Sequence, residues 1–569
     1  MTDAFDRRSF LSLAAAGAAA GIASTGNAEA RAPRRDSMSS DLRALIEAER
    51  DAIRAGLPGS GIEGVSVCLL HESAPVWTEG FGRTGAGGRP VGPDTIFSIQ
   101  STSKNFTAVA VLLAVQEGLL DLDLPISRYL PDFDVHSRFE AAPADRITLR
   151  LLLSNRAGFT HEAPVGNNYE PDSPGFEAHI RSICDTWLRF PVGDRYRYSN
   201  LGYDLAGYIL QRQSGLGYAE WLRQKVFAPL GMRDSTADPA VYTGVENRAA
   251  GHQPGHDRVP PVTPLVASGG VYSSARDMAA YCAFHLARGR FEGRQILARE
   301  LWGEMHGFAL GGDYGLGVIR EERRYGNTPV RMLSHAGGGF GFGCVFTYCP
   351  EAGLAWTAMF NSPVAAGYRF GSGLVENLLA ARFGARAPRL PADALAPIAL
   401  TTRQKGRIVG SYIGRNVRGD IGLSDGRLRF RREEVDAPDE LFATSPDDFF
   451  LSGADGEVVR YRRHPASGDL PAHLECSTGE HSLDFNGGPH DPPGPDRPEW
   501  SRYVGRYRVH QWGRPVMDVT VERRDGYLHL NGMRLVVETE PGLFFTSDGE
   551  AVDFRNAVPT WRNLLLRPV

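Results

Sequence analysis

The sequence predicts an α+β domain followed by two small antiparallel β-barrels, in a chain of 569 residues. Three observations support this fold class. First, the segment after Ser101 has apolar residues at helical spacing, and Gly118 ends it. These apolar residues are Phe106, Val109, Leu113 and Val115. Second, a glycine-rich run over 337–343 leads into a predicted strand at 345–348. Third, from about residue 386 the chain changes in character and a module occurs twice.

The repeated module is defined by four pairs of similar segments, at offsets from 93 to 100 residues. The pairs are 409–412 with 504–507, 425–428 with 525–528, 449–450 with 544–545, and 455–459 with 548–552. Asp-Gly at 425–426 and again at 525–526, between β-branched or aromatic runs, predicts antiparallel hairpins. Each copy is therefore predicted to be a small β-barrel. The predicted domains are a signal peptide at 1–30, the α+β domain at 41–385, a linker at 386–402, barrel one at 403–488, a proline-rich linker at 489–500 and barrel two at 501–569.

The lysine content singles out one residue. Only three lysines occur against 59 arginines, and Lys104 stands three residues after Ser101. A guanidinium stays protonated in proteins, whereas a buried lysine can lose its proton and act as a base. On a helix the two residues lie one turn apart on the same side. S-x-x-K alone is common by chance, so the rest of the chain decides its meaning.

Two further segments carry suitable polar groups. Tyr198 and Asn200 precede a helical pattern; the phenol can share a proton with Lys104, and the carboxamide can bind a substrate carbonyl or amide. His335 opens the glycine-rich run. Glycines on an edge strand leave backbone N–H groups open to a ligand, as an oxyanion hole requires. Taken singly, a flexible loop and a surface histidine are the simpler interpretations of this run.

Together, S-x-x-K at 101–104, Y-x-N at 198–200 and H-x-G at 335–337 resemble the serine β-lactamase and penicillin-binding-protein superfamily, in the family's order. Segments 151–158 and 267–278 are similar to it as well. The resemblance implies an antiparallel sheet flanked by helices. The catalytic residues that it implies are Ser101, Lys104 and Tyr198, the substrate-binding residues are Asn200, His335 and Gly337, and the oxyanion hole consists of the backbone N–H groups of Ser101 and Gly338.

Two positions depart from the family pattern. These are Asn155, which replaces the usual His, and Ala336, which replaces the Thr of the K-T-G triplet. In addition, His335 takes the place of the Lys of that triplet. Lys and Thr of that triplet help to bind a substrate carboxylate in β-lactamases and carboxypeptidases, and an unperturbed His is mostly neutral at pH 7. We therefore expect an ester or amide substrate with no free carboxylate next to the reacting bond.

Two barrels after such a domain resemble the architecture of D-aminopeptidase, in which a barrel loop limits the substrate to short peptides. This favours a serine hydrolase that releases N-terminal D-amino acids through an acyl-enzyme. The N-terminal amine would need a carboxylate, for which an acidic barrel loop is the expected source. The alternatives are a carboxylesterase, a β-lactamase or D-Ala-D-Ala carboxypeptidase, and a non-catalytic binding protein; the barrels are equally open to a role as spacers.

The N-terminus predicts export. Arg7 and Arg8 form a twin-arginine signature, followed by a mildly apolar stretch at 11–23 and the small-residue pattern Ala28-Glu29-Ala30. Cleavage after Ala30 would give a periplasmic or secreted enzyme. No other apolar run approaches the ~20 residues of a membrane span.

Composition excludes several classes of partner. The formal charge of −5 without a basic stripe argues against nucleic acid. Pro and Gly between His252 and His256 forbid the helix that would align them as metal ligands, so we expect no metal and no cofactor. Six cysteines do not make a disulfide scaffold, and Cys344 and Cys349 fall on opposite faces of a strand. The expected partner is a small molecule or short peptide, and a homodimer is left open.

Overall fold

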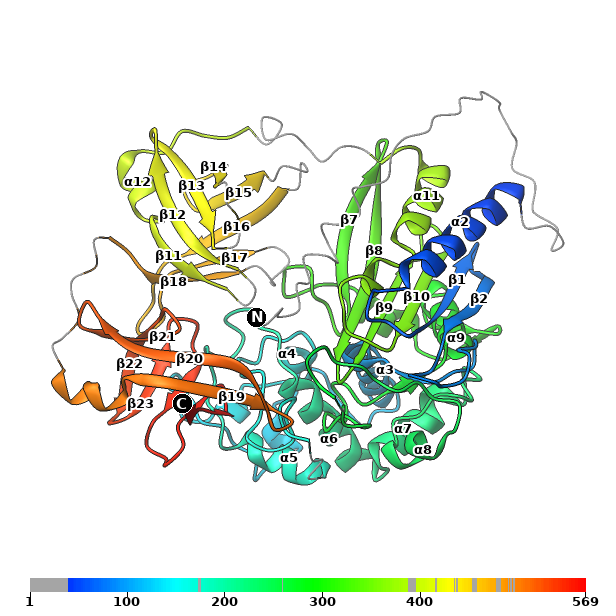
Figure 1. Ribbon diagram of the computed structural model, residues 1–569, viewed down its shortest axis with the longest axis horizontal. Helices are drawn as coiled ribbons and strands as arrows, with labels where there is room; N and C mark the ends of the chain where they lie inside the picture. Colours follow the sequence, from blue (N-terminus) through cyan, green and yellow to red (C-terminus); the bar gives the residue numbers. More distant parts are fainter. Residues whose placement is uncertain are drawn as a thin grey trace.

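The computed structural model describes residues 39–569, except 172–174, 258, 387–395, 415–416, 434, 436–437, 453–457, 477–481, 490, 492–493 and 495–496. The predicted signal peptide at 1–30 lies outside the described residues, as does much of the predicted linker at 386–402. Figure 1 shows an α+β domain on the right and two β-barrels, one above the other, on the left.

A six-stranded antiparallel sheet forms the centre of the N-terminal domain, in the order β2-β1-β10-β9-β8-β7. Its strands are β1 (Gly64–His71), β2 (Ala74–Gly82), β7 (Ile319–Tyr325), β8 (Thr328–Gly339), β9 (Phe342–Cys349) and β10 (Leu354–Phe360). β10 is buried along its whole length and β1 nearly so, which is why their sequences are continuous apolar runs rather than alternating ones. The sheet thus has helices on both faces.

The two faces of the sheet have separate cores. α2 (Ser40–Gly56) and α11 (Ser372–Phe383) pack on one face through residues such as Ile53 and Leu379. α9 (Ala275–Leu286) packs on the other face, together with α3 (Ser103–Gln116) and most of the remaining helices. These are α4 (Leu149–Leu153), α5 (Phe176–Ile183), α6 (Leu201–Ser214), α7 (Tyr218–Leu222) and α10 (Arg299–Met305). α8 (Pro239–Gly244) lies in a separate small cluster through Tyr242. Two short pairs complete the domain, β3 (Phe97–Ser98) with β4 (Tyr272–Ser273) and β5 (Arg290–Phe291) with β6 (Arg294–Gln295).

The helix predicted after Ser101 is present, but it has no polar face. α3 is buried on all sides from Ser103 to Ala114, so the prediction of a single apolar face was too narrow. It ends at Gln116, and Gly118 beyond it has φ of 73°, as its predicted role as terminator requires. A fully buried helix can bury polar side chains that no surface helix would hide.

The first repeat is a closed eight-stranded barrel. Its strands are β11 (Gly410–Ile413), β12 (Arg418–Ser424), β13 (Arg427–Arg432), β14 (Asp439–Ala443), β15 (Asp448–Ser452), β16 (Val458–His464), β17 (His473–Cys476) and β18 (Leu483–Gly487). Packing of this barrel reaches back into the segment predicted as linker, because Ile398 N donates to Ala443 O and Leu400 lies in the barrel core. The short α12 (Thr402–Gly406) follows.

The second repeat is a nine-stranded antiparallel sheet, in the order β26-β25-β24-β23-β22-β21-β20-β19-β27. Its strands are β19 (Gly505–Gln511), β20 (Arg514–Arg524), β21 (Tyr527–Leu530), β22 (Met533–Glu540), β23 (Leu543–Thr546), β24 (Ala551–Asp553), β25 (Thr560–Trp561), β26 (Leu564–Leu565) and β27 (Arg567–Pro568). The two end strands of this sheet, β26 and β27, are separated by Leu566 alone, so the sheet curls back on itself into a nearly closed barrel.

The predicted Asp-Gly hairpins are confirmed in both barrels. Asp425 and Gly426 have φ of 51° and 73°, and the equivalent Asp525 and Gly526 have φ of 53° and 79°. Each pair forms a two-residue turn, between β12 and β13 and between β20 and β21. The repeat extends to side chains, since Tyr412 and Tyr507 each donate to the carbonyl four residues earlier at 2.9 Å. The two modules therefore share strand order, turn chemistry and this tyrosine contact.

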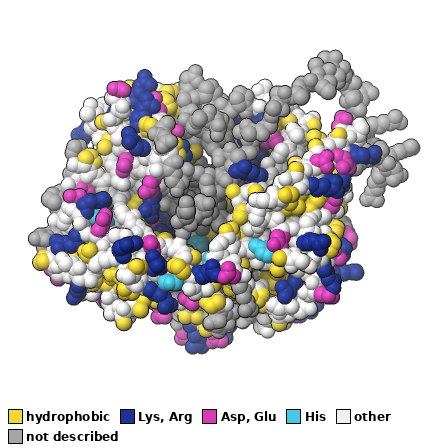
Figure 2. Space-filling view, in the orientation of Figure 1, with side chains coloured by type: hydrophobic (Ala, Val, Ile, Leu, Met, Phe, Trp, Pro, Cys, Tyr) yellow, Lys and Arg dark blue, Asp and Glu magenta, His cyan; other side chains and the backbone are white. Residues whose placement is uncertain are grey.

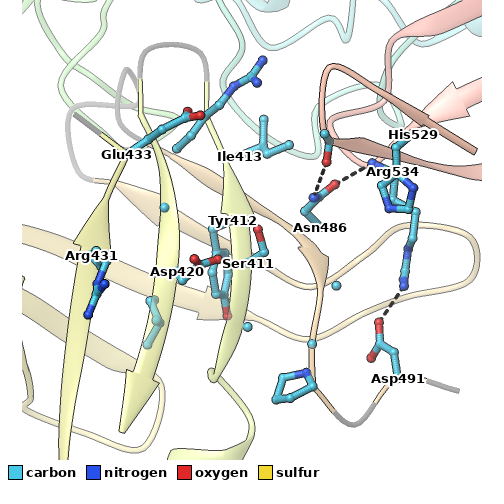
Figure 3. Close-up of a pocket in the computed structure, with 18 of the residues that line it drawn as sticks. Ser411, Tyr412, Ile413, Asp420, Arg431, Glu433, Asn486, Asp491, His529 and Arg534 are labelled. Atoms are coloured by element: carbon cyan, nitrogen blue, oxygen red, sulfur yellow. Dashed lines mark hydrogen bonds and ion pairs between the residues drawn. The ribbon is translucent and has the colours of Figure 1, made fainter. Parts of the chain in front are cut away.

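The barrels meet each other around Asn486 of β18. Its Nδ2 donates to Gly532 O at 2.9 Å, and its Oδ1 accepts from Arg534 N at 2.8 Å. A polar cavity of about 1110 Å³ lies beside this junction, with the ion pair of Arg534 and Asp491 on one wall (Figure 3). None of its lining residues belongs to the site predicted from the sequence.

The described surface mixes charges of both signs, as Figure 2 shows for one face. All of the cysteines except Cys184 are buried. Within the described ranges, no helix has both the length and the hydropathy to cross a bilayer.

Candidate active site

Ser101 lies at the entry to α3, in a short 3₁₀ turn over Gln100–Thr102. It is partly exposed, whereas the residues that follow it are buried. Gln100 has φ of 49°, a left-handed conformation that is rare for a residue with a side chain, and its Nε2 donates to Ser98 Oγ at 2.7 Å. The backbone therefore bends sharply just before Ser101, which leaves the hydroxyl at the mouth of the helix.

Lys104 is fully buried one turn along α3. Its Nζ is 3.2 Å from Ser101 Oγ, 2.7 Å from Asn200 Oδ1 and 2.9 Å from the Ser268 carbonyl oxygen. The ammonium also lies 4.8 Å from the centre of the Tyr198 ring. Three segments distant in sequence, at 101–104, at 198–200 and at Ser268, thus meet at one amine, and they include three of the predicted site residues besides Lys104.

The number of donors on Lys104 matters chemically. An ammonium has three N–H groups, and the three contacts of Nζ engage all of them. A neutral amine has two N–H groups and one lone pair. Asn200 Oδ1 and Ser268 O can only accept, so in the neutral form the lone pair is left for Ser101, whose hydroxyl can donate. The arrangement therefore suits a lysine that takes a proton from the serine.

Asp204 fixes the carbonyl that holds Lys104, a role that the sequence did not indicate. It lies one turn after Asn200 on α6, is fully buried, and accepts from the backbone N–H groups of Ala267 and Ser268 at 2.8 and 2.9 Å. Its other oxygen accepts from Ser268 Oγ at 2.8 Å. α6 thus supports the lysine twice, directly through Asn200 and indirectly through Asp204.

Tyr198 is buried just before α6, and Asn155 anchors the backbone on both sides of it. Asn155 O accepts from Arg197 N at 2.8 Å, and Asn155 Oδ1 accepts from Ser199 N at 3.0 Å. Asn155 itself has φ of 58°, a region that Asn tolerates better than most residues. The departure from the family's His at this position therefore has a visible structural use.

His335 is buried beside Tyr198, with 6.4 Å between their ring centres. Its Nδ1 lies 2.8 Å from the Ala336 carbonyl oxygen, which can only accept, so Nδ1 carries a hydrogen. In a neutral ring, Nε2 then accepts from the hydroxyl of Tyr314 at 3.1 Å. Tyr314, which the sequence did not single out, also packs on Tyr196 and Tyr198. The histidine thus faces a phenol.

The glycine-rich segment ends β8, but β8 is not an edge strand as predicted. β7 pairs with it from Thr328 to Ser334, because β7 begins only at Ile319. Residues 335–339 extend past that point and pair with β9 alone. The outer edge of the strand is therefore open only at this end, beside the turn that carries Ser101.

The absence of a side chain at Gly337 permits this approach. A Cβ there would lie 2.0 Å from the Ile99 carbonyl oxygen, so no other residue fits without a backbone shift. Tyr368 OH donates to Gly337 O at 2.8 Å and fixes the strand from the other side. Gly338, the predicted second oxyanion donor, is next in the chain. Its N–H remains a predicted donor, together with that of Ser101.

A second histidine reaches Tyr198. The His161 ring stacks on it with centres 5.9 Å apart, and the side chain of His161 is 25% exposed. His161 Nδ1 is 2.7 Å from Glu162 Oε1, and Glu162 also accepts from Asn168. Burial would raise the pKa of the Glu162 carboxyl, but the charge and hydrogen bond of His161 and the hydrogen bonds from Asn168 hold it below its ordinary value. No sequence motif marks this pair.

A hairpin of the second barrel touches the N-terminal domain near the end of β8. Trp512, at the tip between β19 and β20, packs on Phe340 at 5.1 Å between ring centres, and the backbone N–H of Trp512 donates to Tyr169 O at 2.9 Å. Phe340 directly follows the glycine run. Arg514 donates to Gly255 O at 2.9 Å and pairs with Asp257. This hairpin is thus a barrel loop that contacts the N-terminal domain beside the end of β8.

The hairpin does not carry the acidic residues expected for an amine site, since its tip over 511–514 reads Gln-Trp-Gly-Arg. Other barrel carboxylates reach the N-terminal domain and pair with arginines there, namely those of Asp469, Glu475, Asp484, Asp548 and Glu550. The barrels therefore contribute an aromatic ring and neutralised acids to this side of the domain.

His252 and His256 do not form a metal site. His252 Nε2 lies 3.3 Å from Glu63 Oε2, and the His256 ring packs on Trp512. Across the described ranges, no three His, Cys, Asp or Glu side chains come together as metal ligands.

Comparisons with known proteins agree with this fold. A profile of the family described as Beta-lactamase matches residues 42–379. The unguisins hydrolase ungD′ of Aspergillus campestris is 28% identical over 343 residues, which cover 56% of this chain and 62% of that protein. The D-alanyl-D-alanine-carboxypeptidase/endopeptidase AmpH of Escherichia coli K12 is 25% identical over 324 residues, 54% of this chain and 81% of AmpH. The crystal structure of SurE superposes with a TM-score of 0.53 at 25% identity, covering 78% of this chain and all of that one.

The chain spans 62%, 44% and 49% of the lengths of the first three curated relatives that it matches, so much of each relative has no counterpart here. The family profile, by contrast, covers more than half of this chain and contains all the predicted site residues. The chain belongs to the beta-lactamase family, one of the serine hydrolases related to penicillin-binding proteins.

Proposed function

We propose that the protein hydrolyses amide bonds of short peptides or amino-acid amides through an acyl-enzyme on Ser101, and releases N-terminal D-amino acids. The observation that carries the hydrolytic part is the amine of Lys104, buried and 3.2 Å from Ser101 Oγ with its other contacts on obligate acceptors. In this mechanism Lys104, with Tyr198 beside it, takes the proton of Ser101 as the hydroxyl attacks the acyl carbon. The same pair then returns the proton to the leaving amine.

The oxyanion of the tetrahedral intermediate would bind to the backbone N–H groups of Ser101 and Gly338. This assignment is supported by the bend at Gln100 and by the open end of β8, which lie against each other through Ile99 and Gly337. Asn200 Oδ1 is engaged by Lys104, so the contact of Asn200 with a substrate falls to its amide NH₂ group. Water then attacks the acyl-enzyme, and Ser101 leaves with a proton from the same base.

The choice of an amide substrate without an adjacent carboxylate is supported by His335 and Ala336. His335 donates through Nδ1 to a backbone carbonyl and meets the Tyr314 hydroxyl through Nε2, so both ring nitrogens are engaged within the protein and neither is left for a substrate carboxylate. Ala336 supplies no hydroxyl. AmpH, whose name places it among enzymes of D-alanyl-D-alanine bonds, makes a D-residue next to the reacting bond the leading choice.

The limit to short substrates is supported by the hairpin at Trp512. Its contact with Phe340 places a barrel side chain next to the end of β8, where a peptide bound along that strand would continue. Replacing Trp512 by Ala removes the aromatic ring at the hairpin tip and leaves both barrels in the chain. We expect longer peptides to gain relative to aminoacyl amides, with turnover of the smallest amides unchanged within about threefold.

The test is a substrate panel on the purified full-length protein, comparing D- and L-aminoacyl p-nitroanilides, p-nitrophenyl esters and a chromogenic cephalosporin. Ser101→Ala is the blank for each substrate, and a fluorophosphonate probe followed by tryptic mass spectrometry identifies the acylated serine. Faster turnover of D-aminoacyl anilides than of the other substrates is the expected result. Labelling of a serine other than Ser101 would refute the mechanism.

The panel also separates the alternatives. Turnover confined to p-nitrophenyl esters would identify a carboxylesterase, since an ester needs no protonation of a poor leaving amine. Cephalosporin hydrolysis faster than anilide hydrolysis would overturn the argument from His335 and Ala336. Probe labelling of Ser101 without turnover of any class would leave a binding protein.

A further inference from the structure

A buried carboxylate of the first barrel reaches two arginines of the N-terminal domain. Asp484 lies on β18, and its side chain is 1% exposed. Its Oδ1 accepts from Arg195 Nη1 at 3.1 Å, and its Oδ2 accepts from Arg197 Nη2. The two arginine side chains are only 3% and 9% exposed. One barrel residue therefore provides an anionic partner for two buried guanidinium groups.

These arginines lie three residues and one residue before the predicted catalytic tyrosine. Arg197 is the neighbour of Tyr198, and its backbone N–H is bonded to Asn155 O at 2.8 Å. Both guanidinium groups also lie over the Phe190 ring, at 4.2 Å for Arg195 and 5.2 Å for Arg197. The residue before Tyr198 is thus fixed three times: by Asn155 at its backbone, and by Phe190 and Asp484 at its side chain.

Asp484 is the carboxylate that hydrogen-bonds to both Arg195 and Arg197, whereas the charge of Asp548 reaches Arg197 from a greater distance. Asp194, the neighbour of Arg195, accepts from Arg195 Nε but is 33% exposed. His473, opposite Asp484 on β17, does not add a cation, because burial and the nearby charges of Arg195, His464 and Arg197 lower its pKa to about 2. Loss of the Asp484 charge would leave the buried Arg197 guanidinium without its hydrogen-bonded anion, which is strongly unfavourable.

We propose that Asp484 of the first barrel is a positioning residue that holds Tyr198 in place through Arg197 and keeps the charge beside the Lys104–Tyr198 pair balanced, so that the barrel completes the active site. The proposal rests on the proposed function, because it assigns Asp484 a role toward the residues of that mechanism. It differs from the role of the Trp512 hairpin, which faces the substrate and belongs to the other barrel.

The competing interpretation is that Asp484 only attaches a barrel. The second barrel offers a matched control, since Asp548 is also fully buried and its Oδ2 lies 3.1 Å from Arg189 Nη2. Arg189 is separated from Tyr198 by eight residues along the chain, and the charge of Asp548 reaches Arg197 without the hydrogen bond that Asp484 accepts from it. A role in attachment predicts similar effects of the two carboxylates, whereas a positioning role predicts different ones.

The experiment compares Asp484→Asn with Asp548→Asn in the full-length protein, by thermal unfolding and by pH profiles of kcat and kcat/KM. For Asp484→Asn we expect kcat to fall about 10- to 100-fold with KM little changed, because displaced catalytic groups cost that much. The acidic limb of the profile should move to lower pH by about half a unit or more, because an uncompensated cation disfavours the protonated base. Asp548→Asn should lower the unfolding temperature and move the limb clearly less than Asp484→Asn, because Asp548 reaches Arg197 by its charge and not by a hydrogen bond.

Arg197→Gln is the complementary variant, and it tests the positioning role of Asp484 if Asp484→Asn does not fold. It leaves the carboxylate in excess, so the acidic limb should move to higher pH, and combining both changes should return the limb toward the wild-type position. The groups facing the titrating pair, His161, His335, Tyr203 and Tyr314, are unchanged in every variant.

Equal effects of Asp484→Asn and Asp548→Asn, or opposite-charge variants that move the limb in the same direction, would overturn the proposal. Failure of the proposed function is seen separately, because the wild-type protein would then lack a fluorophosphonate-labelled Ser101 or any turnover to profile.

Discussion

Replacing Lys104 by arginine tests whether the site needs a base or only a positive charge. Lys104 Nζ has two partners that can only accept, Asn200 Oδ1 at 2.7 Å and Ser268 O at 2.9 Å. A guanidinium can donate to both, so these acceptors keep a partner in Lys104→Arg. What arginine cannot provide is a lone pair for the Ser101 hydroxyl, because it does not lose its proton in proteins.

The size of the effect follows from that single loss. General-base catalysis typically contributes about 10²–10⁴ in rate, or about 3–5.5 kcal/mol of transition-state stabilisation. We therefore expect kcat/KM of Lys104→Arg to fall by that factor. The larger head group must also fit a fully buried space between the Tyr198 and Tyr203 rings, 4.8 and 5.6 Å from the amine, which adds about 1–3 kcal/mol of destabilisation by overpacking.

The assay is the steady-state rate on the best substrate of the panel, with thermal unfolding to show that the variant is folded. Lys225→Arg is the matched control, because Lys225 is 33% exposed and pairs with Glu117 at 2.6 Å, an interaction that arginine can replace. Lys225→Arg should keep full activity. A folded Lys104→Arg protein with more than a tenth of the wild-type kcat/KM would refute the base, since charge alone would then be sufficient.

Three further predictions concern the surroundings of the site. Asn155→Ala removes the acceptor for Ser199 N–H and places alanine, which tolerates the left-handed region less well than asparagine, at φ of 58°. Urea unfolding should therefore show a loss of about 2–4 kcal/mol in the free energy of unfolding, and a loss under about 0.5 kcal/mol would contradict the anchoring of Tyr198. Gly337→Ala places a Cβ 2.0 Å from the Ile99 carbonyl oxygen and should abolish probe labelling of Ser101 in a protein that is otherwise folded by circular dichroism; normal labelling would show that the strand can yield. Burial alone would raise the pKa of Asp548, but the charges of Arg189 and Arg562 hold this pKa below its ordinary value of 3.8, so the stabilisation by Asp548 is complete above pH 3.8 and is lost as the pH falls further. Asp548→Asn should therefore be less stable than the wild type near neutral pH, and its stability should depend less on pH below about 4. Parallel acid-unfolding curves of the two proteins would show that this ion pair does not cause the acid sensitivity.

The sequence predicted those parts of the molecule whose signal is local. The Asp-Gly turns at 425–426 and 525–526 were predictable because only residues that tolerate positive φ fit a two-residue hairpin. Ser101 and Lys104 lie one helical turn apart by spacing alone, so their contact at 3.2 Å needed only the helix to be correct. The helix itself was predicted with one apolar face, and its polar residues were not expected to be buried.

The parts that the sequence did not predict depend on long-range packing. Nothing local marks Asp204 as the support of the Ser268 carbonyl, because the contact joins residues 64 positions apart. Tyr314 and His161 likewise reach the site only through tertiary packing. β8 was predicted as an edge strand because glycines suggested an open backbone, whereas the opening arises from the shorter β7, a length difference that no property of β8 encodes.

The use of arginine elsewhere in the chain sharpens the meaning of Lys104. Buried cations at the boundary between the N-terminal domain and the barrels are all arginines in the contacts described above, namely Arg189, Arg195 and Arg197, and each donates to carboxylates. Such positions favour a planar, permanently charged donor group. Lys104 is equally buried, yet the hydroxyl, carboxamide and carbonyl that contact its Nζ at 2.7 to 3.2 Å carry no negative charge. Uncharged partners lower the cost of losing the proton, and an amine with two obligate acceptors keeps one lone pair for Ser101. A chain that uses arginine for buried charge therefore has a lysine where the chemistry requires a group that can become neutral.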